Sequence, residues 1–575
     1  MNNSLALARA RNARHYVLSF AVPLALVSLS IAGAILALNA SFNLMPLFSD
    51  EVMLAALTKG VMHHGFGFLS TWRFTSDNYT LDAWPVLASI YLLFGYSPSV
   101  IVASGWVFYI ANAIGLGLVA YRFVSWRWSL VVVTLCLLFS GQALTTIGFL
   151  EFTVSHDSTW TLALCGWLLL LWKRPTDLWR PLLLLVIFCG TVSDPWFDAA
   201  FTFPVVITLW LQNRYGSDSY KNPGLVKAIV YTYLSARILY WLVGEKVLRC
   251  FPGRGAGLDF THIPLHALWI MRDVSGLLGI PDHPAFVMIG LVVWVAALVR
   301  LLAGAFLQES TTPAHVTLLS VGVLSVGGLL AAGLLDSLTN NIMSGRYFIN
   351  VVYILLLFGV IGIAMAAKQR AYGATSIVVA GLIVFSAVGF QSLLVTPFSL
   401  TPRSVGDHAL FSALAKRHLG AGFGPYFMGV NSNTSDIWDG GRRRVFPVLI
   451  KHHGEIAPWY VQTSRRWFEP KRNKKPSREF LVMPLGGSPN WRQAAMRTFG
   501  KPADVLDIGP FRVWVWNKHL RKVMRENQVA HRKAWHKFNI IRNRAVISRV
   551  SNILGISDKG LQRIYSWLLI HHWAD

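Results

Sequence analysis

The chain has 575 residues, of which 54% are hydrophobic and only 14% are charged, and its mean hydropathy is +0.47. Soluble proteins carry about 25% charged residues, so this composition excludes a fully soluble enzyme. Residues 396–575 hold 30 Lys and Arg against 11 Asp and Glu, so +19 of the total net charge of +25 lies in this third of the chain, which suits anionic lipid headgroups or acidic glycans and argues against a nucleic-acid partner.

Apolar stretches of about 20 residues recur before residue 396, and each is long enough to cross a bilayer as a helix. The first, near 16–38, follows Arg9, Arg11 and Arg14 and shows no clear cleavage pattern, so we expect an uncleaved first crossing. Further crossings are expected near 98–121, 128–149, 158–172, 180–193, 197–212, 225–245, 285–306, 314–335, 347–367 and 374–395. The sequence therefore predicts an all-α polytopic transmembrane bundle of eleven helices, with residues 1–395 as the transmembrane catalytic domain.

The Lys and Arg residues of the short connections predict how the bundle is oriented. With a cytoplasmic N-terminus, the inner turns contain Arg122, Arg127, Lys173, Arg174, Arg180, Arg214, Lys221, Lys368 and Arg370. The short outer turns contain Arg346 alone. An odd number of crossings then places the long loops 39–97 and 246–284 outside, together with everything after residue 395. Both loops contain amphipathic pieces, beginning at Glu51 and Leu265, that we expect to form short helices at the interface.

After Val395 the long apolar stretches end. The chain continues as mixed polar segments with short β-like runs, such as Glu479–Pro484 and Phe511–Trp516. We interpret 396–518 as a small soluble extracytoplasmic α/β domain. The tail 519–575 mixes basic residues with Trp and Ile in helical patterns, which is typical of an amphipathic segment lying on a membrane. Basic residues are not expected to gather outside, so a miscounted crossing, with the tail inside, stays open as an alternative.

Ionisable residues beside membrane spans are costly and are functional candidates by default. In this chain they collect at the predicted outer ends of the crossings: Asp50 and Glu51, Glu151, His156 and Asp157, Asp194 and Asp198, and Asp336 and Arg346. A transporter more often places such groups near the bilayer midplane. The pattern therefore predicts a one-sided active site.

Asp50 and Glu51 follow Ser49 at the start of an amphipathic helix. Acids in a first helical turn are favoured by the helix dipole, and Ser49 is suited to cap the helix, so capping explains one carboxylate. It explains a pair at the exit of a transmembrane helix less well. We interpret the pair as catalytic, with capping as the alternative.

Four short motifs carry a resemblance to a known superfamily. They are Asp50-Glu51 in the first outer loop, His156-Asp157 in the second, Gly345-Arg346-Tyr347 before a late crossing, and Thr498-Phe-Gly-Lys-Pro followed by Phe511–Trp516 near the end of the outer domain. Together with the N-terminal crossing, they make most of 16–518 similar to the GT-C glycosyltransferases, the superfamily of protein O-mannosyltransferases and lipid A aminoarabinose transferases.

The resemblance implies transfer of a sugar from a polyprenyl-phosphate-linked donor to an envelope acceptor, which is a glycan, a lipid or a protein, at the outer face of a bacterial inner membrane. It implies that Asp50 is the general base and that Glu51 orients it or the acceptor. A guanidinium matches a phosphate well, so Arg346 is expected to bind the carrier phosphate, against the alternative of an interfacial snorkelling residue. The other expected substrate-binding residues are His156, Asp157, Tyr347 and Asp194, of which Asp194 is equally suited to cap the sixth crossing.

Some members of the superfamily hold a divalent metal ion between acidic residues. Here Mg²⁺ or Mn²⁺ would need Asp50 together with Asp157 or another loop acid, and the first loop has no Asp-x-Asp. We therefore predict a metal-independent mechanism without a cofactor. Two other functions remain as alternatives: transport or flipping of a lipid-linked glycan, and a noncatalytic scaffold for envelope assembly.

Overall fold

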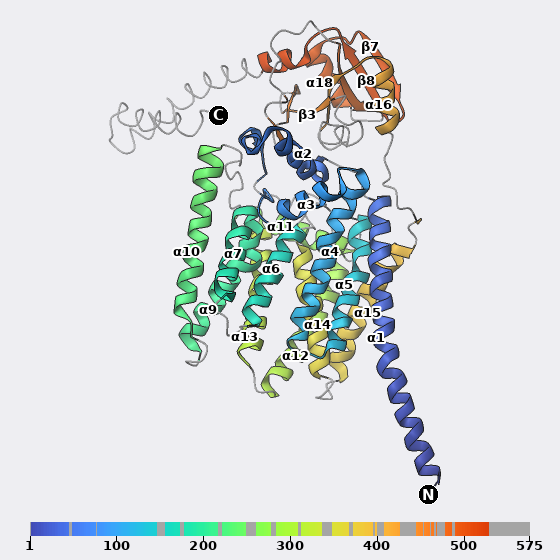
Figure 1. Ribbon diagram of the computed structural model, residues 1–575, viewed down its shortest axis with the longest axis vertical. Helices are drawn as coiled ribbons and strands as arrows, with labels where there is room; N and C mark the ends of the chain where they lie inside the picture. Colours follow the sequence, from blue (N-terminus) through green and yellow to red (C-terminus); the bar gives the residue numbers. More distant parts are fainter. Residues whose placement is uncertain are drawn as a thin grey trace, which may run out of the picture. The chain divides into compact units, whose positions relative to one another are not determined.

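The structure is a computed structural model of the full chain (Figure 1). It describes the backbone of residues 2–44, 49–75, 77–146, 156–172, 178–216, 221–248, 260–277, 283–308, 312–335, 348–366, 372–394, 397–398, 407–425, 444–451, 454–459, 462–464, 467, 478–485 and 489–527. Contacts divide the chain into two compact units. Unit 1 comprises 1–411, 426–443 and 460–466, and unit 2 comprises 412–425, 444–459 and 467–575.

Unit 1 is a bundle of long apolar helices with short helices between some of them. Its helices are α1 (Asn2–Leu44), α2 (Ser49–His64), η1 (Phe66–Thr71), α3 (Trp84–Phe94), α4 (Pro98–Tyr121), α5 (Trp126–Thr146), α6 (His156–Leu171), α7 (Trp179–Ser193), α8 (Pro195–Phe197), η2 (Asp198–Thr202), α9 (Phe203–Tyr215), α10 (Pro223–Leu239), η4 (Tyr240–Val247), α11 (Ile263–Leu277), α12 (Pro284–Gln308), α13 (Pro313–Leu335), α14 (Ile349–Ala366) and α15 (Tyr372–Leu394). The segments η2 and η4 are π-helical.

Six helical segments among the described residues are long and apolar enough to cross a membrane. They are Phe20–Asn43, Pro98–Tyr121, Pro223–Val247, Pro284–Gly304, Pro313–Leu335 and Ile349–Ala366, and shorter apolar helices such as Trp126–Leu138 and Trp179–Ser193 accompany them. A helix rises 1.5 Å per residue, so the 24 residues of α4 extend about 36 Å, which exceeds the hydrocarbon core of a bilayer. The predicted polytopic transmembrane bundle is confirmed.

Close backbone approach and interhelical hydrogen bonds hold the bundle together. The Tyr109 hydroxyl of α4 donates to the carbonyl of Leu137 in α5 at 2.6 Å, and the Ser30 and Thr134 hydroxyls join α1 to α5 at 2.9 Å. At Gly328 of α13, an added Cβ would lie 2.7 Å from the carbonyl oxygen of Ala199 in η2. Small residues and buried polar side chains of this kind are how membrane helices associate without a hydrophobic driving force.

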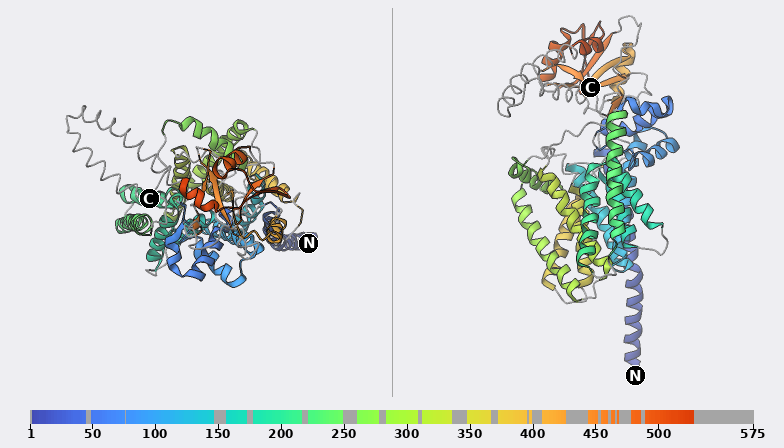
Figure 2. Two further views of the ribbon diagram at one scale, coloured as in Figure 1. Left: turned by 90° about the horizontal axis from the view of Figure 1, so that it is seen from above. Right: turned by 90° about the vertical axis from the view of Figure 1, so that its left-hand side faces the viewer.

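Two short helices from the loop after α1 lie beyond one end of the bundle. The views in Figures 1 and 2 agree in placing α2 and α3 there. The indole Nε1 of Trp84 donates to the Thr58 hydroxyl at 3.0 Å, which ties α3 to α2. The strand β1 (Trp72–Arg73) pairs with β5 (Thr463–Ser464) in an antiparallel two-stranded sheet within unit 1. The amphipathic pieces predicted in the two long loops form α2 and α11.

Unit 2 contains a six-stranded mixed sheet with the strand order β4-β3-β2-β6-β8-β7. Its elements are β2 (Ala421–Pro425), β3 (Arg444–Ile450), β4 (Ile456–Pro458), β6 (Glu479–Pro484), α18 (Pro489–Phe499), β7 (Asp504–Ile508) and β8 (Phe511–Trp516), and α16 (Asp407–Lys416) runs from unit 1 into it. The central strand β2 is parallel to β3 and β6, and the outer pairs are antiparallel. The predicted α/β fold is confirmed, and two predicted β-like runs are β6 and β8.

A short helix over 520–527 packs onto the sheet of unit 2. A buried carboxylate of β6, Glu479, accepts a hydrogen bond from the backbone N–H of Leu520 at 2.6 Å and so caps this helix. Leu520 and Met524 are buried. The remainder of the predicted tail, 528–575, lies outside the described residues, and the expected domain boundaries stay predictions.

Candidate active site

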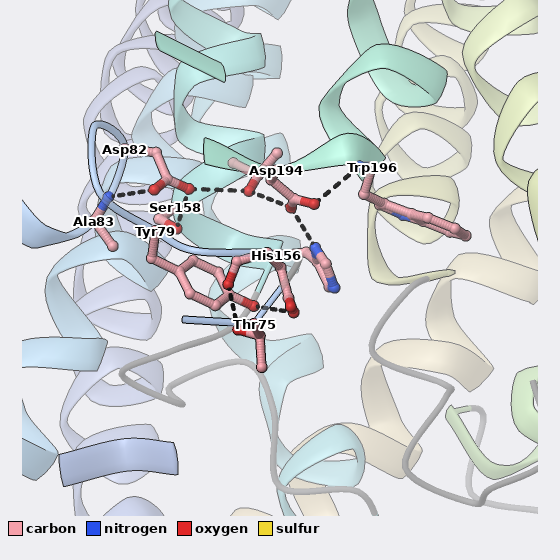
Figure 3. A network of polar contacts seen from close by, with 10 residues as sticks. Thr75, Tyr79, Asp82, Ala83, His156, Ser158, Asp194 and Trp196 are labelled. Atoms are coloured by element: carbon pink, nitrogen blue, oxygen red, sulfur yellow. Dashed lines mark hydrogen bonds and ion pairs between the residues drawn. The ribbon is translucent and has the colours of Figure 1, made fainter. Parts of the chain in front are cut away.

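The centre of the candidate site is a buried histidine–aspartate pair at the start of α6. His156 Nδ1 lies 2.5 Å from Asp194 Oδ2, and only 3% and 1% of the two side chains are exposed. His156 is the first residue of α6, and Asp194 follows the last residue of α7. The sequence placed these residues in separate turns at the same predicted face, and the fold brings them into contact (Figure 3).

Asp194 also fixes the turn that leads into the next crossing. Its Oδ1 accepts a hydrogen bond from the backbone N–H of Trp196 at 2.9 Å and caps α8, and its Oδ2 accepts one from the Thr159 hydroxyl at 2.7 Å. Capping and pairing therefore occur together, because they use different oxygens of the carboxylate. Burial raises the pKa of Asp194, but the charge and hydrogen bond of His156, with the donors Thr159 and Trp196, outweigh it and hold the pKa below its usual value.

A second buried carboxylate, Asp82, reaches the same turn of α6. Asp82 Oδ2 lies 3.0 Å from the Ser158 hydroxyl and 3.1 Å from the Thr159 hydroxyl, and Oδ1 accepts the backbone N–H of Ala83 at 2.8 Å. Burial and the nearby Asp194 carboxylate raise the pKa of Asp82 to about 6, and the three donors oppose the shift. The two acids have environments that push their pKa values apart, which is common in active sites.

The loop that carries Asp82 is fastened to the turn that carries Asp194. The backbone N–H of Asn78 donates to the carbonyl of Ser193 at 2.8 Å, and its side-chain amide donates to the carbonyl of Val192 at 2.7 Å. The backbone N–H of Leu81 donates to the Ser193 hydroxyl at 2.9 Å. These bonds, two of which end on main-chain carbonyls, fix the separation of the two acids.

Tyr79 has a strained backbone inside this loop. Its φ of 55° lies in the left-handed region, which is uncommon for a residue with a large side chain. Its buried ring lies 6.5 Å from the His156 ring, centroid to centroid, and the Trp196 ring lies 6.0 Å from the same His156 ring. Strain of this kind persists where the surroundings over-determine a conformation, and such residues cluster at functional sites.

Asp157 is buried beside the pair and is tied to α4 through its main chain. Its carbonyl accepts hydrogen bonds from the Asn112 amide at 3.1 Å and from the Thr161 hydroxyl at 2.9 Å. The Thr161 hydroxyl also lies 2.8 Å from the Asn112 side-chain oxygen. These contacts hold the first turn of α6 against α4.

Asp198, predicted at the same face, belongs to a different contact. It forms an ion pair with Arg237 of α10 and accepts a hydrogen bond from the Thr191 hydroxyl at 2.8 Å. Asp198 is buried, and it begins the π-helical η2, while Arg237 precedes the π-helical η4. The ion pair therefore joins η2 to α10, close to the point where α10 continues as η4.

The structure describes only part of the predicted catalytic set. Asp50 and Glu51 lie in the first turn of α2, as expected, and their side chains are outside the described residues. Arg346 and Tyr347 lie outside the described residues altogether. Of the predicted set, the structure brings together His156, Asp157 and Asp194.

Sequence reasoning missed Asp82, Asn78 and the hydroxyls of Ser158 and Thr159. Asp82 did carry a signal, because it is an acid directly before the apolar run of α3 in a predicted outer loop. Ser158 and Thr159 carried none, because hydroxyl residues are common at the starts of helices. Among the described residues, no group of three His, Cys, Asp or Glu side chains is placed to hold a metal ion, and no step below uses one.

Similar proteins of known structure include two crystal structures of one enzyme. The crystal structure of ArnT from Cupriavidus metallidurans in the apo state is similar with a TM-score of 0.42 and 13% sequence identity, over 85% of this chain and 97% of that chain. The structure of ArnT from the same organism bound to undecaprenyl phosphate is similar with a TM-score of 0.41 and 11% identity, over 86% and 97%. No protein-family model matches the chain, and no curated protein matches its sequence. At this identity the similarity concerns the fold alone, so the roles proposed below rest on the residues of this chain.

Proposed function

We propose that the chain is a glycosyltransferase of the cell envelope, which moves a sugar from a polyprenyl-phosphate-linked donor to a glycan, lipid or protein acceptor at the non-cytoplasmic face of the membrane. The observation that carries the proposal is the buried network of His156, Asp194 and Asp82 at one end of a transmembrane bundle. A lipid-linked substrate requires a site beside the bilayer, and polar groups buried there are costly enough to indicate a function.

The reaction needs three kinds of group. The acceptor oxygen or nitrogen attacks the anomeric carbon of the sugar, the bond from that carbon to the phosphate oxygen breaks, and the phosphate leaves with the electron pair. Asp50 takes the acceptor proton, with Glu51 orienting it, and Arg346 balances the charge on the leaving phosphate. These three roles follow from the sequence.

His156 and Asp157 complete the proposed substrate site, together with Tyr347. The Asp194 carboxylate holds the His156 ring in one orientation through Nδ1, as a carboxylate does in other sites where a histidine must present its second nitrogen. Asp194 then acts through His156, as a positioning residue. In this proposal the oriented His156 ring contacts a sugar hydroxyl or the carrier phosphate.

Transport of a lipid-linked glycan remains a second candidate because of one observation. Arg237, which pairs with Asp198 of η2, lies on the candidate span Pro223–Val247, and charges within spans are typical of transport pathways. The two functions differ in their product, because transfer breaks the sugar–phosphate bond and transport leaves it intact.

The test is incubation of the purified protein with labelled polyprenyl-phosphate sugars and candidate acceptors. We expect the label to move to an acceptor, and Asp50→Asn to slow turnover by about 100-fold or more while the protein stays folded. The matched control is Asp504→Asn in unit 2, where the carboxylate makes an exposed ion pair with Arg478, and it should keep full activity. Intact donor appearing across a vesicle membrane, or full activity in Asp50→Asn, would overturn the proposal.

A further inference from the structure

The Thr159 hydroxyl lies between two buried carboxylates. Its Oγ1 is 2.7 Å from Asp194 Oδ2 and 3.1 Å from Asp82 Oδ2. A hydroxyl has one proton to donate, so it cannot donate to both acids at once. The shorter distance assigns its proton to Asp194, which also pairs with His156. The contact with Asp82 is then a hydrogen bond only when Asp82 itself carries a proton and donates to Thr159.

When Asp82 is protonated, each of the three contacts that link Ser158, Asp82, Thr159 and Asp194 has one donor and one acceptor. The Ser158 hydroxyl donates to Asp82, Asp82 donates to Thr159, and Thr159 donates to Asp194. Two buried carboxylates joined by one hydroxyl disfavour the state in which both are charged, because like charges in a buried site repel strongly. The raised pKa of Asp82, which burial and Asp194 cause, agrees with this reading of the geometry.

The other titratable groups around Asp82 come from the elements packed against it. His156 and Asp157 begin α6, Asp194 follows α7, and Asp77 lies on the same loop as Asp82. Cys189 of α7 lies within electrostatic reach of Asp82. Asp77 accepts the Tyr79 hydroxyl at 2.9 Å. Among these groups, Asp194 is the acid that contacts the same hydroxyl as Asp82, that of Thr159.

We propose that Asp82 and Asp194 hold one proton between them through the Thr159 hydroxyl, and that this proton strengthens the binding of a phosphate-bearing lipid donor by removing one negative charge from the site. The second half of the proposal rests on the proposed function. Asp82 acts on the donor through its charge and is a positioning residue. By linkage, a bound phosphate favours the protonated pair, and loss of the proton at higher pH weakens binding.

The first test measures the proton directly in the purified full-length protein. Infrared difference spectroscopy records the carbonyl stretch of a protonated carboxylic acid as the pH is raised from about 5 to about 8. We expect a band that disappears with a midpoint near pH 6 and is absent in Asp82→Asn. Thr159→Val removes the acceptor of the Asp82 proton and should move the midpoint to lower pH.

The matched control for Thr159→Val is Thr161→Val, on the same helix. Its hydroxyl contacts Asn112 and the Asp157 carbonyl and touches neither acid of the pair. The band and its midpoint should be those of the unmodified protein. Persistence of the band in Asp82→Asn, or equal midpoints in Thr159→Val and Thr161→Val, would show that the shared proton does not exist.

The second test measures binding of a methyl diester of a short polyprenyl phosphate, whose single charge is fixed in this pH range. We expect its affinity to fall roughly three- to tenfold between about pH 5.5 and 7.5, where tenfold corresponds to about 1.4 kcal/mol. Asp82→Asn should remove this dependence and Thr161→Val should keep it. The uncharged polyprenol should bind equally at both pH values.

The outcomes separate this inference from the proposed function. Diester binding with the same pH dependence in Asp82→Asn would overturn the inference and leave the lipid-phosphate donor in place. Failure of the diester to bind at either pH would overturn the donor class, and with it the role given to the proton, even if the infrared band behaves as expected.

Discussion

Asp82 makes the folded protein sensitive to pH, with a sign that follows from its environment. Its pKa rises from an ordinary value of 3.8 to about 6 on folding. The folded state then binds more protons than the unfolded state in this window, so stability falls as the pH rises from about 4 to about 6 and stays reduced above it. The loss is on the order of 2–3 kcal/mol, from about 1.4 kcal/mol per pH unit.

Asp82→Asn should remove this loss, because an amide of the same shape has no charge to bury. We expect the variant to melt at a higher temperature than the unmodified protein near pH 7.5 and at the same temperature near pH 4. Thermal unfolding in detergent at the two pH values measures the difference. An equal difference at both values would mean that the substitution acts through packing and that Asp82 does not titrate in this range.

Single residues were predictable from the sequence where their chemistry stands out against an apolar background. His156, Asp157 and Asp194 are ionisable residues at the ends of spans, and the structure brings all three to one place. Asp82 lies in a polar loop, where an acid is ordinary, and its burial depends on Asn78 reaching the turn at Ser193. Contacts between residues more than 100 positions apart leave no periodic signal in the chain.

At the scale of helices, two adjacent glycines of α13 give a sharp test of close packing. An added Cβ at Gly328 meets the carbonyl oxygen of Ala199, and the backbone cannot move aside cheaply, whereas at Gly327 nothing lies within 4 Å. We expect Gly328→Ala to destabilise the bundle by about 1–3 kcal/mol. Gly327→Ala should be neutral or slightly stabilising, because alanine favours a helix by about 1 kcal/mol over glycine. Thermal unfolding of both variants decides the matter, and equal melting temperatures would contradict the packing described here.

The ion pair between η2 and α10 should show strong coupling. Removing either partner leaves the other charge buried without its counter-charge, which lowers the free energy of unfolding by about 3–5 kcal/mol. Removing both partners leaves no buried charge at this contact. Asp198→Leu and Arg237→Leu should therefore each be more destabilising than the double variant. A double-mutant cycle on unfolding free energies measures the coupling. Additive effects would show that the pair does not contribute as a unit.

The helices themselves were largely predictable, because a bilayer demands long apolar segments and leaves little choice of conformation. The expected crossings near 98–121 and 314–335 match α4 and α13 closely. The π-helical segments were not expected. They begin at Asp198 and shortly after Arg237, the two partners of an ion pair between helices.

At the scale of the whole molecule, the predicted orientation can be tested at the two ends of one helix. Ser97 and Ser125 are exposed and lie just before and just after α4. In intact cells, with the native cysteines replaced, Ser97→Cys should react with a membrane-impermeant maleimide. Ser125→Cys should react only after the membrane is made permeable. The opposite pattern would reverse the orientation and move the proposed site to the cytoplasmic face.

The link between Asn78 and the turn at Val192 and Ser193 has a consequence for how the protein could diversify. Two of its bonds end on peptide carbonyls, which every amino acid supplies equally. Substitution of neighbouring aromatic residues such as Tyr79 and Trp196 would therefore leave these two hydrogen bonds, and the spacing of the Asp82 and Asp194 carboxylates, in place. Such substitutions would change the surroundings of the His156 ring without moving Asp82 away from Asp194.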